Sequence, residues 1–260
     1  DYKRIRTRLA CQQFETNGKS DSAIALPLYL RYGLEFVDHL RGEFSIVLYD
    51  HLQQRLVLIR DRFGIKPLYF AKNSQGLVWG SEVKAILKHP DVQPQLSDKA
   101  ALHQMMQVMV PGSTAFQGVE ALLPGHMLIV QQRGDHLETT LKRWWDLEFP
   151  DSHETGADPA PYVQGVQERL IDAVATRLEA DVSVGCYLSG GIDSCSILGL
   201  ATTLQQSPIK AFTIAFDNAE YDESHIAKLM AQRCGAEQEL MLLTEKELYG
   251  PAFERATWHA

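Results

Sequence analysis

The strongest chemical signal in the sequence is the segment 189–194, which reads S-G-G-I-D-S. Gly190 and Gly191 allow a tight turn in which successive backbone N–H groups point at one ligand, and a following helix adds the positive end of its dipole. Ser189 and Ser194 add hydroxyl donors with little bulk. These residue types in this order predict a site for an oxyanion such as a phosphate or pyrophosphate group.

Asp193 narrows the kind of ligand that this segment predicts. A carboxylate repels a phosphate group unless a hard cation such as Mg²⁺ lies between them, so we expect a nucleotide together with Mg²⁺, with Asp193 as a metal ligand. The alternative is a tight turn whose glycines serve packing only. The complete string after an apolar run favours nucleotide binding, and the absence of the phosphate-binding Lys excludes a Walker A loop.

The elements around this segment alternate between strand and helix patterns, which predicts parallel βαβ units. Apolar residues at 163, 166, 170, 171, 174 and 178 form a helical stripe that we expect to face the core and cover the sheet. The predicted strands are 182–188, 210–216 and 238–242, of which the first is expected to be buried. The predicted helices are 163–178, 195–205 and 225–234.

The N-terminal part has a different pattern, with paired β-rich runs separated by turn residues. The predicted hairpins pair 43–50 with 55–61, 68–72 with 77–80 and 127–131 with 137–144. Residues 21–40 carry helical spacing with Pro27 inside, which predicts a bent or broken helix. Ser97 is expected to cap a helix that Pro111 and Gly112 stop. This part is therefore predicted to be mostly antiparallel.

A change of composition between Pro150 and Pro161 separates the two patterns, because this stretch is rich in Pro, Asp, Ser, Thr and Gly and has no apolar period. We therefore expect one domain over residues 1–149, a linker over 150–161 and a second domain over 162–260.

Composition excludes several classes of protein. The chain of 260 residues has a formal charge of −8 and is 45% hydrophobic, which argues against a disordered chain and against electrostatic nucleic-acid binding. No apolar run approaches the ~20 residues that cross a membrane, so we expect no membrane partner. The cysteines form no metal or disulfide pattern, which favours free thiols and a cytoplasmic location.

Beyond these patterns, the sequence resembles a known family. The S-G-G-I-D-S segment resembles the pyrophosphate-binding loop of N-type ATP pyrophosphatases. Four further segments resemble the glutamine-hydrolysing asparagine synthetases in order and spacing: G-E-F-S-I-V-L-Y-D at 42–50, R-D-R-F-G-I-K-P-L-Y at 60–69, S-E-V-K-A at 81–85 and L-P-G-H at 123–126.

The resemblance implies an α+β first part, a partial N-terminal-nucleophile glutaminase sandwich with antiparallel sheets of the class II glutamine amidotransferase type. It also implies a partial α/β parallel-sheet ATP-pyrophosphatase domain in the second part. The implied reaction uses L-glutamine, L-aspartate, ATP and Mg²⁺. In it the aspartate side chain becomes an acyl-adenylate, and ammonia then displaces AMP. Relatives of this kind also suggest a homodimer.

Site residues follow from the resemblance position by position. The implied ATP-loop residues are Ser189, Gly190, Gly191, Asp193 and Ser194. Leu188 and Ile214 match positions that touch the adenine nucleotide, and Asp21 matches the aspartate that holds the amino group of glutamine. From the local sequence alone, a helix N-cap is an equal alternative for Asp21. Arg60 and Asp61 are interpreted as scaffold, in the form of a strand-end ion pair.

The family's nucleophile is a cysteine at the mature N-terminus, and Cys11 does not match it. The resemblance thus implies a fragment truncated at both ends, with the catalytic nucleophile and a second synthetase loop outside it. Two alternatives stay open: a secondary-metabolite amide ligase or cyclase of the same fold, and a non-catalytic binding module.

Overall fold

The computed structural model describes residues 2–11, 20–73, 76–108, 110–134, 136–151, 158–218, 220 and 222–259. The chain divides into two compact units, Asp1–Ser152 and His153–Ala260, called the first and second unit below. The predicted linker 150–161 lies partly outside the described residues, and its last two residues belong to the first turn of a helix.

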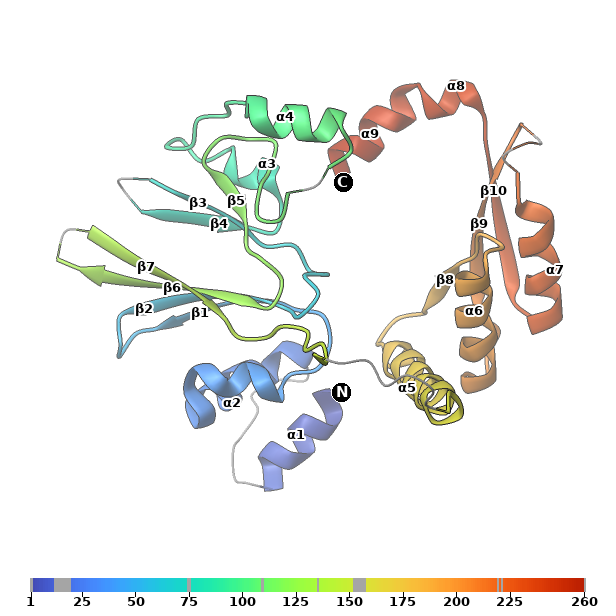
Figure 1. Ribbon diagram of the computed structural model, residues 1–260, viewed down its shortest axis with the longest axis horizontal. Helices are drawn as coiled ribbons and strands as arrows, with labels where there is room; N and C mark the ends of the chain where they lie inside the picture. Colours follow the sequence, from blue (N-terminus) through green and yellow to red (C-terminus); the bar gives the residue numbers. More distant parts are fainter. Residues whose placement is uncertain are drawn as a thin grey trace. The chain divides into compact units, whose positions relative to one another are not determined.

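The first unit contains two antiparallel sheets with helices on their outer sides (Figure 1). The first sheet has the order β1-β2-β6-β7, with β1 (Ser45–Asp50), β2 (Arg55–Arg60), β6 (His126–Arg133) and β7 (His136–Arg143). The second has the order β4-β3-β5, with β4 (Leu77–Gly80), β3 (Tyr69–Lys72) and β5 (Val119–Ala121). The helices are α1 (Tyr2–Cys11), η1 (Asp21–Ile24), α2 (Ala25–Tyr32), η2 (Gly33–His39), α3 (Val83–Ile86) and α4 (Asp98–Met105).

Strand β2 joins two of the three apolar cores that hold these layers together. Val57 and Ile59 pack with α1, α2 and η2, whereas Leu58 points the other way and packs between the two sheets. A third core, which includes Ile86, lies between the second sheet and α3. The predicted antiparallel character of this part is therefore confirmed, and β2 is buried on both faces because it lies between two apolar layers.

The helical segment after Asp21 is broken, as predicted, but the break lies at Gly33 rather than at Pro27. Pro27 sits in the first turn of α2, where its missing N–H has no intrahelical role. Gly33 ends α2 with a φ of 57° that suits glycine. Ser97 caps α4 as predicted by accepting from the Ala100 N–H, and α4 ends at Met105, well before Pro111.

The second unit contains a parallel sheet of order β10-β9-β8. Its strands are β8 (Gly185–Tyr187), β9 (Lys210–Phe216) and β10 (Glu237–Leu243), and its helices are α5 (Ala160–Leu178), α6 (Ile192–Leu204), α7 (Ser224–Cys234), α8 (Glu245–Leu248) and α9 (Pro251–His259). Ala211 of β9 packs in one core with residues of α6 and α7. Ala215, on the same face of β9, is also buried. The predicted parallel βαβ arrangement is therefore confirmed.

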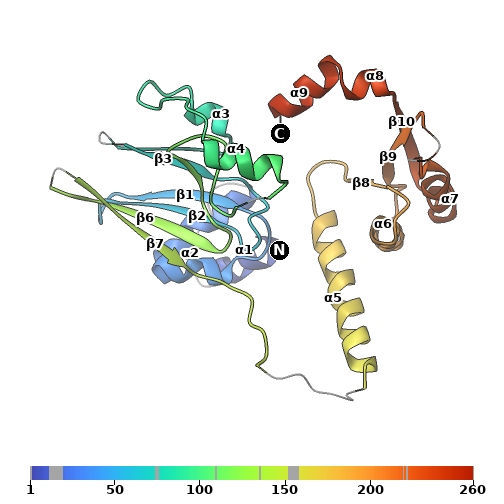
Figure 2. The ribbon, with the colours of Figure 1, turned by 45° about the horizontal axis from the view of Figure 1, so that its top comes forward.

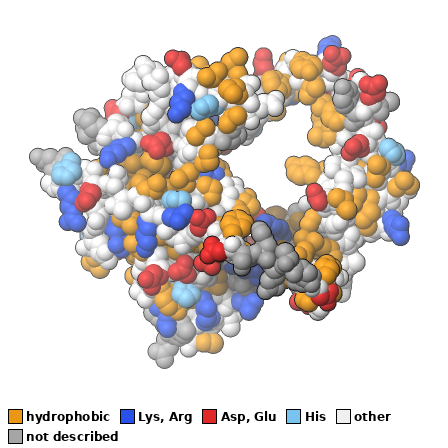
Figure 3. Space-filling view, in the orientation of Figure 1, with side chains coloured by type: hydrophobic (Ala, Val, Ile, Leu, Met, Phe, Trp, Pro, Cys, Tyr) orange, Lys and Arg blue, Asp and Glu red, His pale blue; other side chains and the backbone are white. Residues whose placement is uncertain are grey.

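Two predictions about burial in this unit are wrong. The strand predicted over 182–188 is limited to β8, and Val182 and Tyr187 are exposed. The apolar stripe of α5 (Figure 2) does not cover the sheet along its length: Val174 is buried, but Val163 and Val166 are 65% and 66% exposed. Hydrophobic side chains accordingly stand on the visible surface of the unit (Figure 3). A helical period identifies an apolar face, and the described residues supply a partner for only part of it.

Within the ranges that the structure describes, no helix combines the length and apolar character needed to cross a bilayer. The four cysteines are free thiols, as predicted.

Candidate functional site

The 189–194 loop lies between β8 and α6, at the carboxyl end of the parallel strand, where α/β sheets bind their ligands. Gly190 has a φ of +88°, and a Cβ there would lie 3.2 Å from the Glu223 carbonyl oxygen and 3.3 Å from the Ala227 nitrogen. The loop therefore passes so close to the start of α7 that a side chain at Gly190 would be doubly unfavourable. Gly191, with a φ of −69°, is the N-cap of α6.

The first turn of α6 offers donors to a ligand. Helix geometry leaves the first N–H groups without intrahelical partners, and within the described part of the chain the N–H groups of Ile192, Asp193 and Ser194 have no acceptor. Ile192 and Asp193 are exposed, so these groups lie at the surface. These N–H groups and the helix dipole are the donors that an oxyanion site requires, and binding of an oxyanion here stays a prediction.

The two loop serines hydrogen-bond with each other and with the loop backbone. Their hydroxyl oxygens are 3.1 Å apart, and Ser194 Oγ also donates to the Gly191 carbonyl at 3.1 Å. The Ser189 N–H donates to Ser194 Oγ, and the Gly191 N–H donates to Ser189 Oγ, both at 3.3 Å. These are long contacts between exposed or half-exposed groups, so the loop is held weakly by its own side chains.

Asp193 is exposed in the first turn of α6. Among the described residues, no group of three or more His, Cys, Asp or Glu side chains is arranged to hold a metal ion. Asp193 contributes one exposed carboxylate, and a Mg²⁺ ion held by it would take its other ligands from phosphate oxygens and water, as Mg²⁺ usually does in nucleotide sites; this metal role stays a prediction.

The two residues expected to touch the nucleotide base differ in exposure. Leu188 is 1% exposed, packs in the core and donates its N–H to the Phe212 carbonyl at 2.8 Å. Ile214 is 56% exposed, on the face of β9 opposite to the buried Thr213. Only Ile214 thus presents its side chain at the surface, and contact of either residue with a nucleotide stays a prediction.

Asp222 is a site-supporting residue that the sequence reasoning missed. Its carboxylate accepts hydrogen bonds from the Phe216 N–H at the end of β9 and from the N–H and hydroxyl of Ser224 at the start of α7. The Ser224 hydroxyl holds the pKa of Asp222 below its ordinary value. These bonds fix the start of α7, against which Gly190 packs. The sequence signal that could have identified Asp222 is an Asp two residues before a Ser at the start of a helix.

Asp21, the predicted ligand for the amino group of glutamine, is exposed at the start of η1. The N-cap is Ser20, so the N-cap alternative for Asp21 is wrong. Asp21 Oδ1 accepts from the Ser22 N–H at 2.7 Å and from the Ser20 hydroxyl at 3.1 Å. These bonds orient the carboxylate, and within the described residues its Oδ2 accepts none, so it is available to an ammonium group.

The side chains of Arg60 and Asp61 both bind backbone groups of the 61–67 loop, and they do not form an ion pair with each other within the described residues. Asp61 is 1% exposed, and its carboxylate accepts from four backbone N–H groups, those of Phe44, Phe63, Ile65 and Lys66. The Arg60 guanidinium donates to the carbonyls of Gly64, Lys66 and Leu122. The scaffold interpretation is therefore confirmed, with backbone hydrogen bonds in place of the expected ion pair.

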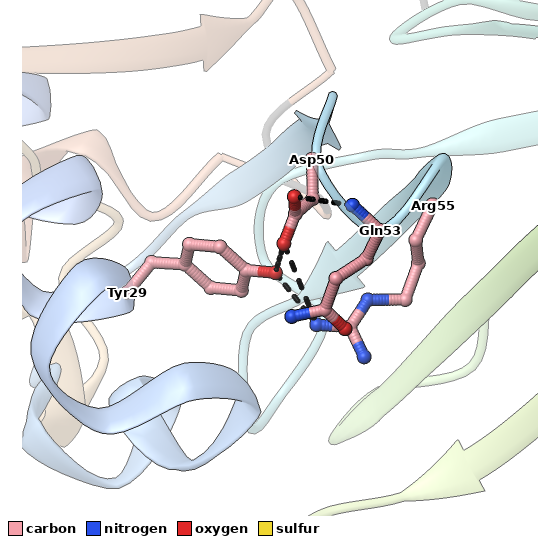
Figure 4. A network of polar contacts seen from close by, with 4 residues as sticks. All are labelled: Tyr29, Asp50, Gln53 and Arg55. Atoms are coloured by element: carbon pink, nitrogen blue, oxygen red, sulfur yellow. Dashed lines mark hydrogen bonds and ion pairs between the residues drawn. The ribbon is translucent and has the colours of Figure 1, made fainter.

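A second polar cluster of the first unit joins α2 to the β1–β2 hairpin (Figure 4). The Tyr29 hydroxyl donates to Asp50 Oδ2 and accepts from Arg55 Nη2 at 2.6 Å, and the Gln53 N–H donates to Asp50 Oδ1. Burial raises the pKa of Tyr29, and the hydrogen bond from Tyr29 lowers the pKa of Asp50. The Tyr29 hydroxyl, the Asp50 carboxylate and one guanidinium nitrogen of Arg55 contact one another, which indicates a structural role, whereas the buried Nε of Arg55 has no hydrogen-bond partner within the described residues.

The fold and the loop define a class of protein, in which an antiparallel two-sheet unit is joined to a parallel-sheet unit with a Gly-Gly loop between strand and helix. Sequence comparison gives the family. The family described as "Glutamine amidotransferase domain" matches residues 1–145, and "Asparagine synthase" matches residues 165–260. The chain therefore belongs to the glutamine-hydrolysing asparagine synthetase family.

Three curated relatives show the range of this family. The chain is 39% identical to the protein named amidase chyE of Penicillium rubens and 37% identical to amidase chry2 of Gibberella zeae, in each case over 100% of this chain and 40% of the relative. It is 31% identical to asparagine synthetase [glutamine-hydrolyzing] 3 of Bacillus subtilis, over 84% of this chain and 35% of the relative. The chain thus spans about two fifths of the length of these relatives.

Proposed function

We propose that the protein forms an amide from a carboxylic acid and ammonia released from glutamine, with ATP and Mg²⁺ activating the acid. In this reaction the carboxylate oxygen attacks the α-phosphorus of ATP, which gives an acyl-adenylate and releases pyrophosphate. Ammonia then attacks the acyl carbon and AMP leaves. Aspartate is the first candidate for the acid, because relatives named asparagine synthetase align with the chain.

The 189–194 loop is the observation that supports this proposal. Its free first-turn N–H groups and its serine hydroxyls suit the charge that develops on a leaving pyrophosphate. Asp193 would hold the Mg²⁺ that screens this charge, which is the chemistry the metal supplies when bound. The tight passage of Gly190 beside α7 keeps the loop in the one shape that collects these donors.

A second candidate is an acid other than aspartate. The two fungal proteins named amidases are more similar to the chain, at 39% and 37% identity, than the aligned asparagine synthetase at 31%. Overall sequence identity of this order does not say which acid is used, because the residues that select the acid need not lie in the matched region. The comparison therefore favours testing a panel of carboxylic acids beside aspartate.

The test is an isotope-transfer assay on the protein expressed from its complete gene. With Mg²⁺-ATP, glutamine and an acid whose carboxylate carries ¹⁸O, we expect AMP and pyrophosphate, with one ¹⁸O atom in the phosphate of AMP. Aspartate and a panel of aromatic and aliphatic acids are compared. ADP as the product, or AMP without the label, would contradict the acyl-adenylate mechanism.

The metal role of Asp193 has its own test. Asp193→Ala should reduce AMP formation by about a hundredfold or more, since it removes the metal-holding carboxylate from the developing charge. Its unfolding transition should stay unchanged, because the side chain is exposed. Asp181→Ala removes another exposed carboxylate of the same unit as the matched control. Equal activity of the two variants would exclude the proposed role.

The proposed role of Asp21 in binding glutamine is tested by comparing glutamine with ammonium chloride as the source of nitrogen. Asp21→Asn should raise the KM for glutamine by about tenfold or more, and it should leave turnover with ammonium chloride unchanged. Asp38→Asn, at another exposed aspartate of the first unit, is the control. A loss of ammonium-dependent turnover in Asp21→Asn would show that Asp21 acts through the fold and not on glutamine.

A further inference from the structure

A chain of hydrogen bonds crosses the parallel sheet directly below the 189–194 loop. The Gln238 side-chain amide on β10 donates to Thr213 Oγ1 on β9 at 2.9 Å, and the Thr213 hydroxyl donates to the Leu188 carbonyl at 2.9 Å. Thr213 is 3% exposed, and Asp61 is the other buried polar or charged residue among those that the structure describes. The chain thus ends at the residue that precedes the loop.

The Leu188 carbonyl and the Ser189 N–H belong to one peptide group, which is planar, so the direction of one fixes the direction of the other. Thr213 holds the carbonyl side of this plane, and on the other side the Ser189 N–H donates to Ser194 Oγ at 3.3 Å. A rotation of the plane would turn the Ser189 N–H, the first of the loop, away from Ser194 Oγ. By holding the Leu188 carbonyl, Thr213 therefore fixes the direction of the Ser189 N–H.

Gln238 decides where the single proton of the Thr213 hydroxyl goes. Because the Gln238 amide donates to Thr213 Oγ1, the hydroxyl proton is left for the Leu188 carbonyl. An acceptor at position 238 would compete for that proton and leave the buried carbonyl without a donor, which is costly. The order of donors along the chain thus depends on an amide at this position.

We propose that Thr213 and Gln238 are positioning residues for the 189–194 loop, which set its affinity for the pyrophosphate part of the nucleotide. The proposal rests on the proposed function of that loop. Packing alone does not account for Thr213, because its neighbours on the same face of β9 are the buried apolar residues Ala211 and Ala215. Valine has the same shape, a high strand preference and no hydroxyl to satisfy in a buried position.

The experiment measures the dissociation constants for inorganic pyrophosphate and for Mg²⁺-ATP by calorimetry, on protein from the complete gene and well below its unfolding temperature. Thr213→Val should weaken both by about tenfold, the effect of one lost buried hydrogen bond, and Thr213→Ser should restore them. Thr202→Val is the matched control. Its hydroxyl donates to helix carbonyls of Leu198 and Gly199, away from the loop, and we expect unchanged binding.

Two substitutions at Gln238 test the direction of the chain. Gln238→Glu should weaken pyrophosphate binding as much as Thr213→Val, because the introduced carboxylate takes the hydroxyl proton. Gln238→Met should have a smaller effect, because it removes only the donor and leaves that proton on the Leu188 carbonyl.

The outcomes separate this proposal from the proposed function. Normal binding by folded Thr213→Val, or equal weakening by Thr213→Val and Thr202→Val in step with lost thermal stability, would overturn the positioning role alone. If the unsubstituted protein binds neither pyrophosphate nor ATP, the proposed function falls, and the positioning role falls with it.

Discussion

Two loops of the molecule collect backbone N–H groups around an oxygen, and they differ in where the oxygen comes from. The 61–67 loop follows β2 and directs its N–H groups at the buried carboxylate of Asp61. The 189–194 loop follows β8 and has only its own serine oxygens, at 3.3 Å, for two of its N–H groups. Further donors in the first turn of α6 have no acceptor within the described ranges.

The difference shows how one backbone arrangement serves two purposes. Where the chain supplies a buried anion, the N–H groups are fully used and the loop is scaffold. Where the chain supplies none, the same arrangement is exposed and suited to an external anion. The same residue type, Asp, is a buried acceptor at position 61 and an exposed group within the 189–194 loop at position 193, so burial and hydrogen bonding distinguish the two positions.

Asp61→Ala gives the largest expected effect. It removes the buried carboxylate that four backbone N–H groups share, so we expect the free energy of unfolding of the first unit to fall by about 4 kcal/mol. Urea unfolding followed by tryptophan fluorescence measures it, since Trp144 and Trp145 lie in this unit. Pyrophosphate binding by the second unit should survive. A first unit that unfolds at an unchanged urea concentration would contradict the scaffold role.

Gly190→Ala and Gly191→Ala form the second test, at the ligand loop. The alanine at position 190 would need a φ of +88° and would press on the start of α7, so we expect a loss of about 2 kcal/mol in stability and at least tenfold weaker pyrophosphate binding. At position 191 a Cβ meets only Ser189 Oγ at 3.4 Å, and this variant serves as the control. Equal behaviour of the two would remove the argument from close packing.

Tyr29→Phe tests the hydrogen bond to Asp50, the second carboxylate of the first unit that is bound by the protein's own donors, and should have the smallest effect. Loss of the hydroxyl that bridges Asp50 and Arg55 should lower stability by about 1 kcal/mol at pH 7. Tyr49→Phe, whose exposed hydroxyl donates to Gln54, is the control. An effect of Tyr29→Phe on pyrophosphate binding would show that this cluster is more than scaffold.

The same variant has a pH signature. The folded pKa of Asp50 is lowered by Tyr29, so this contribution is present above the ordinary Asp pKa of about 4 and is lost as the pH falls through the folded value. The difference in stability between wild type and Tyr29→Phe should therefore shrink as the pH falls below about 4, measured by thermal unfolding. A difference that grows in acid would contradict the assigned cause.

The sequence predicts the strands and the loop well and predicts burial poorly. Alternation in 43–60 and 127–144 identifies the hairpins because each strand is decided by its own local pattern. Val163 and Val166 were expected in the core because their spacing is helical, but spacing cannot say which element covers a face. Val182 and Tyr187 fail for the same reason, since an apolar run predicts a strand and not its exposure.

The sequence names the candidate site residues, whose binding role stays a prediction, but it does not identify the residues that hold the loop in place. Ser189, Asp193 and the two glycines are found because their types and order carry the chemistry. The hydrogen bond from Thr213 to the Leu188 carbonyl joins residues 25 apart, and Asp222 joins the end of β9 to the start of α7. No local pattern records such contacts, because they arise only when the strands are placed side by side.

The serine pair of the ligand loop has one more consequence, which concerns selectivity. In the absence of ligand, Ser189 and Ser194 already engage two loop N–H groups and each other. An anion that takes the Ser189 and Gly191 N–H groups must displace this set, so it gains there only if it brings enough oxygens to replace every bond it breaks. Chloride or a lone carboxylate brings too few, whereas a pyrophosphate brings several. If the loop binds pyrophosphate as proposed, we therefore expect these weak internal bonds to make its affinity for small anions low.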